Sequence, residues 1–222
     1  MEKSLKGIYA GLAALVLMAG VTGCSSTAPV KYTGLESSSR LSPNAGDDND
    51  RIPYRYSAPV DWKKYGKIII EPVSLYQGSD GQFNDMDQAD RRHLADYMQQ
   101  KFGKELTTRF QSATSPSPNT LRLKLTLTGA DTTTQFAGTV TKFDLAGGPY
   151  NIVQSIRGGR GMLSGYVNYA VEIHDAETGE LLLAYVAEQY PNAMNIGATF
   201  GSLSAAETGI DKGAEELLKK LQ

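Results

Sequence analysis

The chain has 222 residues, a formal net charge of −2, and a composition that is 41% hydrophobic and 21% charged. These values fit one soluble domain with appendages and exclude collagen-like, coiled-coil and polytopic membrane proteins. The small negative charge provides no positive field that would attract nucleic acid. One cysteine cannot form an internal disulfide, and together with two histidines it provides too few ligands for a zinc site. We therefore expect no cofactor.

The N-terminus has the features of a secretory signal peptide. Lys3 and Lys6 form a short positive region, and residues 8–20 after them are uncharged. As a helix that run would measure about 20 Å, well short of the ~30 Å hydrocarbon core of a bilayer. It therefore predicts a signal peptide rather than a transmembrane anchor.

The next stretch, Val21-Thr22-Gly23-Cys24, resembles a bacterial lipobox, in which an aliphatic residue and two small residues precede a cysteine. The cysteine thiolate is the nucleophile that takes up a diacylglyceryl group at such sites. The resemblance implies a signal peptide over residues 1–23 and lipid attachment at Cys24, with the lipid bilayer as partner. An ordinary signal peptide that leaves a free thiol at Cys24 is the other interpretation.

The residues after the cysteine bear on localisation. Ser25 and Ser26 stand where an aspartate would retain an enterobacterial lipoprotein in the inner membrane. The lipoprotein resemblance therefore implies an outer-membrane protein that faces the periplasm.

Residues 24–60 predict a lipidated, flexible tether. They contain clusters of Ser, Pro, Gly, Asn and Asp, few aliphatic residues, and no period of 2 or 3.6. The run Asp47–Asp50 predicts a solvated turn rather than a calcium loop, because the spaced ligands and closing glutamate of an EF-hand are missing. The residues that would pin parts of the tether to the domain are Tyr32, Leu35, Tyr54 and Tyr56.

Regular patterns begin near residue 62. Residues 67–76 predict one continuous strand, buried on both faces in its first half and leaving the sheet or lying at its edge beyond Pro72. Asp85 and Gln88 have the spacing of a capping box and predict the start of a long helix. The apolar stripe expected to face the core is Leu94, Tyr97, Met98, Phe102, Leu106 and Phe110.

Three further strands and a second helix follow. Residues 121–128 alternate leucines with polar residues, and this strand is expected to pair in parallel with the first one. Residues 165–174 and 181–190 predict a hairpin, with Gly179 at a positive φ. Ser204 to Glu207 predict a capping box that opens a terminal helix.

Together these elements predict an α+β fold over residues 61–222, a single periplasmic domain large enough to fold alone. Its expected architecture is a mixed sheet of about four strands, in the order β-α-β-insert-β-β-α, with two helices packed on one face.

The insert at 129–165 is long for a connection without clear periodicity. One interpretation is an interaction surface for a protein partner or the bilayer, with Phe143, Arg157 and Arg160 as its candidate residues. The other interpretation is a short strand and a helix that cover the open face of the sheet.

The sequence contains no pattern that predicts catalysis. Gly159, Gly161 and Gly165 miss the dinucleotide spacing and lead into a strand, whereas a phosphate cradle needs a helix N-terminus. No serine lies in a Gly-x-Ser-x-Gly elbow. His93 and His174 are both expected at the surface, so we expect no enzymatic activity and name no catalytic residue.

With the lipobox, residues 31–35 (KYTGL), 62–67 (WKKYGK) and 172–180 (EIHDAETGE), the chain resembles the bacterial lipoproteins grouped as domain of unknown function 3313. The resemblance implies a membrane-anchored protein that faces the periplasm, and it transfers only Cys24 as a functional residue. We therefore expect a non-catalytic, lipid-anchored envelope protein that binds other envelope proteins. A module that binds a small ligand or a glycan is the alternative.

Overall fold

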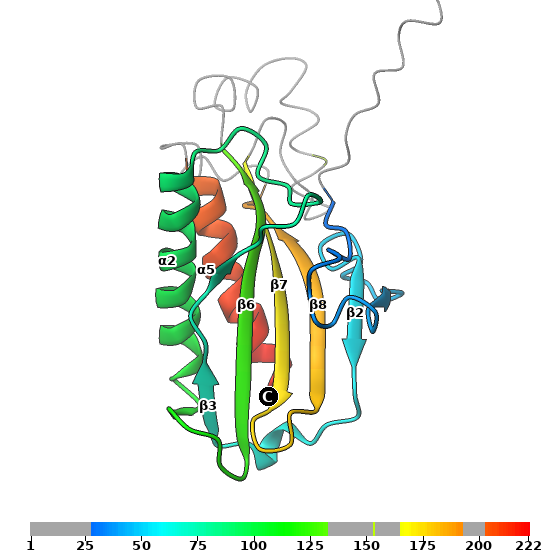
Figure 1. The fold of residues 1–222 in the computed structure, drawn as a ribbon, viewed down its shortest axis with the longest axis vertical. Coiled ribbons are helices and arrows are strands. Elements are labelled where there is room, and N and C mark those ends of the chain that lie inside the picture. Colours follow the sequence, from blue (N-terminus) through cyan, green and yellow to red (C-terminus); the bar gives the residue numbers. More distant parts are fainter. Residues whose placement is uncertain (1–27, 133–152, 154–164, 193–202) are drawn as a thin grey trace, which may run out of the picture.

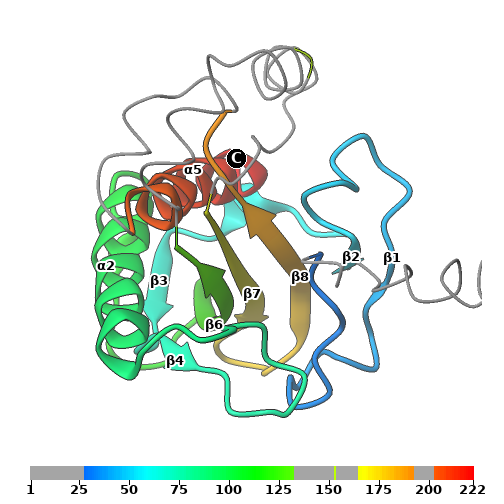
Figure 2. The same ribbon diagram turned by 90° about the horizontal axis from the view of Figure 1, so that it is seen from above.

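The computed structural model describes residues 28–132, 153, 165–192 and 203–222 (Figure 1). They form one eight-stranded mixed sheet with the order β1-β2-β8-β7-β6-β3-β5, and β4 pairs with β6 beside that path. Two helices, α2 (Gln88–Leu106) and α5 (Ser204–Lys220), pack against each other on the same face of the sheet (Figure 2). The predicted α+β class, with two helices and a mixed sheet, is confirmed.

The predicted number of about four strands is wrong, because the prediction missed the short strands β1, β2 and β5 and because its first strand is divided into β3 and β4. Two residues make up each of β1 (Ser42–Pro43), β4 (Ser74–Leu75) and β5 (Gln111–Ser112), and four make up β2 (Tyr54–Ser57). Pieces of this length carry no readable alternation. The expected sheet therefore lacked the strands at both edges of the real one.

Three long antiparallel strands form the centre of the sheet, namely β6 (Thr120–Asp131), β7 (Tyr166–Asp175) and β8 (Leu181–Gln189). The register sets Leu127 opposite Tyr169, whose ring meets that of Phe102 in α2 edge to face, with centroids 5.8 Å apart. Because side chains alternate between the two faces of a sheet, this contact identifies which side chains of β6 and β7 face the helices, namely Leu127 and every second residue before it in β6, and Tyr169 and every second residue from it in β7. The predicted hairpin is confirmed, and Gly179 in its turn has a φ of 75°.

The first predicted strand is interrupted. β3 (Lys67–Ile70) and β4 both pair in parallel with β6, which confirms the parallel strand–helix–strand unit. The prediction of a continuous strand over residues 67–76 is wrong around Pro72, which has no N–H to donate to the ladder. Expected burial on both faces is also wrong, because only Ile68 of β3 is fully buried.

Both helices begin at residues other than those that the capping boxes predict. The N-cap of α2 is Asp87, not Asp85, and its carboxylate accepts a hydrogen bond from the backbone N–H of Asp90 at 2.8 Å. The N-cap of α5 is Leu203, whose side chain makes no capping bond, and Ser204 already lies in the first turn.

The apolar stripes of the two helices lie on the sheet, as predicted. Tyr97 is the exception in α2, since it is only half-buried and its hydroxyl donates to the carboxylate of Asp211 in α5 at 3.2 Å. In α5, Gly213 lies against the Tyr169 hydroxyl, where a Cβ atom would not fit. The fully buried members are Leu94, Met98, Phe102 and Leu106 of α2 and Ile210, Ala214 and Leu217 of α5.

The prediction of a flexible tether is wrong for residues 28–60, which are part of the fold. β2 pairs with β8 and β1 with β2, so this segment supplies one edge of the sheet. Tyr32, Leu41 and Ile52 are buried in the core although they follow no period. The backbone N–H of Ser37 donates to the Glu172 carboxylate at 2.7 Å, which places the segment on the face of β7 opposite the helices.

Candidate functional site

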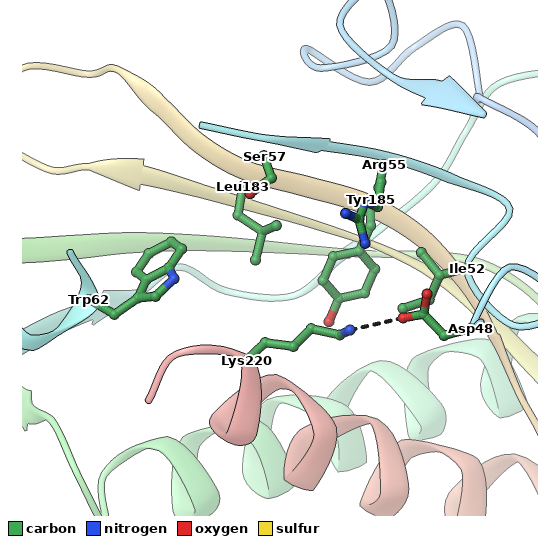
Figure 3. A pocket seen from close by; sticks show the side chains of 8 residues that line it. All are labelled: Asp48, Ile52, Arg55, Ser57, Trp62, Leu183, Tyr185 and Lys220. Atoms are coloured by element: carbon green, nitrogen blue, oxygen red, sulfur yellow. Dashed lines mark hydrogen bonds and ion pairs between the residues drawn. The ribbon is translucent and has the colours of Figure 1, made fainter. Parts of the chain in front are cut away.

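A pocket of about 180 Å³ lies on the helix-bearing face, between the β2–β8 edge of the sheet and the last turn of α5 (Figure 3). The short helix η1 (Trp62–Lys64) and the turn around Asp48 complete its walls. Its lining residues are Asp48, Ile52, Arg55, Ser57, Trp62, Leu183, Tyr185 and Lys220.

The pairing of β2 with β8 explains which side chains enter the pocket. Arg55 lies opposite Tyr185, and Ser57 lies opposite Leu183. Tyr185 in turn lies opposite Val171 on the helix-facing set of β7, so all four side chains point to the helical side. Lys220, the last residue of α5, and the β2 residues Arg55 and Ser57 line opposite sides of the pocket between them.

One ion pair crosses the pocket from the helix to the turn. Lys220 Nζ lies 3.0 Å from Asp48 Oδ2, and Asn44 Nδ2 donates to Asp48 Oδ1 at 2.8 Å. Partial burial raises the pKa of Asp48, but the bonds from Asn44 and Lys220 outweigh it and hold the pKa below its ordinary value. The Asp48 carboxylate is therefore ionised and already engaged.

Arg55 differs from the other charged groups of the pocket. Within the part of the chain that the structure describes, its guanidinium makes no ion pair and no hydrogen bond. The side chain is exposed and reaches the pocket from the sheet, on the wall opposite Lys220 (Figure 3). The pocket thus holds two cations against one carboxylate, and one of the cations is unpaired.

The remaining walls are aromatic and aliphatic. Tyr185 is buried, with its hydroxyl directed toward Lys220 (Figure 3). Burial raises the pKa of Tyr185 well above its usual value, and the nearby Tyr169, Glu216 and Asp48 raise it further. The phenol therefore stays protonated and can donate a hydrogen bond. Trp62 is half-buried and forms the far wall.

These side chains suit binding. The lining residues include no histidine and no cysteine, and among the described residues no group of three or more His, Cys, Asp or Glu side chains could hold a metal ion. Arg55, Lys220 and the Tyr185 hydroxyl are hydrogen-bond donors, and Trp62 offers an aromatic face.

A second cavity, of about 410 Å³, lies on the opposite face of the sheet beside β4 and β6. Two of its charged groups, Lys124 and Glu36, form an ion pair. Lys124 Nζ lies 2.9 Å from a carboxylate oxygen of Glu36, and Glu172 accepts from the backbone of Ser37. This cavity contains three glutamates and one lysine, so it is acidic.

The candidate residues from the sequence analysis lie elsewhere. Cys24, Phe143, Arg157 and Arg160 are outside the described residues, as is most of the insert at 129–165. They stay predictions.

The two histidines differ in exposure. The prediction is confirmed for His93, whose side chain is 54% exposed and lies 2.8 Å from Glu207. It is wrong for His174, which is partly buried, with an Nδ1 atom that has no hydrogen-bond partner among the described residues. The residue lies on the polar face as expected, but residues 28–60 cover that face.

Sequence reasoning missed the pocket entirely. Asp48 and Arg55 lie in the segment predicted as a tether, and Lys220 lies in the last turn of the terminal helix, where a lysine is ordinary. An arginine flanked by two tyrosines in a polar linker was the only local signal.

The described residues form an α+β domain whose N-terminal segment completes both the sheet and the pocket of about 180 Å³. The chain belongs to the family described as protein of unknown function (DUF3313), whose model matches residues 31–217. This confirms the family predicted from the sequence, and the lipoprotein character stays a prediction. The match also includes most of the segment that adds β1 and β2.

Other comparisons add little. A PelC dodecamer from Paraburkholderia phytofirmans is similar at 10% identity, covering 74% of this chain and 94% of that one, with a TM-score of 0.39. The hypothetical protein CT253 from Chlamydia trachomatis is similar at 9% identity, covering 70% and 93%, with a TM-score of 0.30. A search among curated proteins finds no match. In the described ranges no helix is both long and apolar enough to cross a membrane.

Proposed function

We propose that the protein is a lipid-anchored lipoprotein of the bacterial cell envelope, attached to the outer membrane through acylated Cys24 and facing the periplasm. The observation that carries this proposal is the stretch Val21-Thr22-Gly23-Cys24, in which the only cysteine of the chain follows two small residues directly behind an apolar signal-like run. Two or more acyl chains on one residue anchor a protein stably.

The position of the folded body agrees with this attachment. Ala28 is held to the domain through Gln82, whose Nε2 donates to the carbonyl oxygen of Ala28 at 3.1 Å. The backbone N–H of Gln82 in turn donates to the carbonyl oxygen of Thr128 in β6 at 2.8 Å. Only residues 25–27 separate Ala28 from Cys24, and four Cα–Cα steps span at most about 15 Å. A lipid on Cys24 would therefore hold the far end of β6 close to the bilayer surface.

The attachment is testable by one substitution. Cys24→Ala removes the only thiol, so we expect the variant to lack lipid and to leave the membrane fraction, whereas Ser25→Ala stays with the membranes as a matched control. Mass spectrometry of the mature N-terminal peptide is the direct measurement. An unmodified thiol on the protein purified from its own host, with partition into buffer without detergent, would contradict the proposal.

The body of the protein acts, in this proposal, by binding other envelope proteins without catalysis. Photocrosslinkers placed at positions 143, 157 and 160 test the surface that the sequence suggests. Recovery of the same protein from all three positions supports a partner-binding role, and recovery of no specific protein speaks against it.

A second candidate function is the binding of a small ligand or a glycan on the periplasmic side. The pocket at Arg55 favours this candidate, because it combines a cation that has no partner among the described residues with a buried phenol and an indole wall. A ligand at 100 times its dissociation constant adds about 2.7 kcal/mol of stability, which a thermal-shift screen detects.

A further inference from the structure

We infer that the pocket between β2 and the end of α5 binds a small ring compound that carries one acidic group, a carboxylate or a phosphate. This inference deepens the second candidate function. It does not depend on lipid attachment, so either proposal can fail without the other.

The charge of the pocket calls for an anion. Arg55 has no partner among the described residues, while Lys220 shares its charge with Asp48. A guanidinium binds a carboxylate or a phosphate through two parallel hydrogen bonds, and such charge-assisted bonds are the strong ones. Arg55 is therefore the expected primary contact, and the ammonium of Lys220 faces it across the pocket (Figure 3).

The size and walls of the pocket call for a ring. An engineered cavity of about 150 Å³ in another protein holds benzene, so a pocket of 180 Å³ accommodates one six-membered ring with a small substituent. Trp62 and Leu183 offer flat apolar surface for the body of such a compound, and the Tyr185 hydroxyl offers a donor. An inorganic anion alone would leave these walls uncovered.

The cavity beside β4 and β6 does not share this chemistry. On the opposite face of the sheet, Lys124 is paired with Glu36, and Glu71 and Glu172 add negative charge. An anion there would displace an existing ion pair. The charge of the cavity beside β4 and β6 therefore disfavours an acidic ligand, whereas that of the pocket that contains Arg55 favours one.

The chain contains its own reporter for this pocket. Trp62 is the only tryptophan and lines the pocket, so its fluorescence responds to an occupant without any label. The test titrates the purified protein with two matched pairs of probes. Glucuronate is compared with glucose, and phenyl phosphate is compared with phenol. Inorganic phosphate serves as a fifth probe, which lacks a ring.

We expect at least one of the two acids to change the Trp62 emission saturably, and its neutral analogue to bind roughly tenfold to a hundredfold more weakly, the usual effect of losing a charge-assisted bond. Phosphate alone is expected to bind more weakly than the ring acid. The dependence on salt distinguishes this electrostatic contact from apolar binding.

Three substitutions assign the contact. Arg55→Gln is expected to weaken binding of the acid roughly tenfold or more. Arg40→Gln removes the same charge from the opposite face of the sheet, where Arg40 lies against Tyr56, and is expected to leave binding unchanged. Asp48→Asn removes the competing carboxylate from Lys220 and is expected to tighten binding, an effect that a misfolded variant does not produce.

The outcomes separate the alternatives. Weakening by Arg55→Gln with no change in Arg40→Gln supports the inference, and circular dichroism of both variants checks that they are folded. Equal affinity for glucose and glucuronate leaves a ligand-binding pocket but overturns the requirement for an acidic group. The absence of a saturable response to either ring acid overturns the inference as a whole.

Discussion

The two faces of the sheet are covered in different ways. On one face, α2 and α5 lay apolar stripes on the leucines, tyrosines and valines of β6, β7 and β8. On the other face, residues 28–41 lie over a polar row in which Lys124 pairs with Glu36 and Glu172 accepts from the backbone of Ser37. The first cover depends on the volume of a regular apolar stripe, and the second combines specific hydrogen bonds with a few buried side chains such as Tyr32 and Leu41.

The difference shows how an irregular segment becomes part of a fold. The Tyr32 hydroxyl donates to Gln82 Oε1, which also accepts from Asn168 Nδ2 at 2.9 Å. The Tyr32 ring meets that of Tyr76 edge to face, with centroids 5.3 Å apart. A few buried anchors of this kind replace the continuous stripe of a helix.

The helical face should be the more sensitive to loss of volume. Phe102 of α2 is fully buried against Tyr169 of β7. Phe102→Ala should therefore lower the free energy of unfolding by about 4 kcal/mol, because apolar burial is lost and a cavity is created. Chemical denaturation measures this change. Phe102→Leu, which keeps most of the volume, should cost less than half as much. Equal loss in both variants would contradict a packing role.

The second face is tested at Tyr32. If residues 28–60 are part of the fold, Tyr32→Ala should cost about 3 kcal/mol, whereas a flexible tether would tolerate it without loss. Tyr32→Phe keeps the ring and removes only the hydroxyl, so it should cost about 1 kcal/mol. Measured side by side, the two variants separate ring burial from the hydrogen bond. A neutral Tyr32→Ala variant would restore the tether interpretation.

The same contrast explains how much of the fold the sequence could predict. Both helices, the three central strands and the hairpin with Gly179 follow periods of 3.6 or 2, and all of them are confirmed. Residues 28–60 have no such period, although Tyr32, Leu41 and Ile52 are buried in the core. A period reports a regular face, and this segment has none.

The pocket was harder still to predict than the segment that forms it. It depends on the register of β2 against β8, which places Arg55 beside Tyr185, and on where α5 ends. Neither follows from the local sequence, since two residues on β2 and one lysine on α5 meet only in the folded chain. The lipid attachment predicted at Cys24 is the opposite case, because the stretch that resembles a lipobox is contiguous in the sequence; it stays a prediction, since Cys24 lies outside the described residues.

The smallest expected effect is a pH dependence on the segment-covered face. Burial is the largest cause that lowers the pKa of His174, and the positive charges of Lys124 and Arg122 lower it further. The carboxylates of Glu172 and Glu36 partly oppose this lowering.

A histidine whose pKa is lower in the folded state binds fewer protons there than in the unfolded chain near pH 6. Stability is then fully present above the unfolded pKa of about 6.5 and is lost as the pH falls below it, by less than about 1.4 kcal/mol per pH unit. His174→Gln should flatten this slope between pH 7 and 5, as measured by urea denaturation at each pH. An unchanged slope would show that the cover over His174 opens to water in solution, and that the second face is looser than the first.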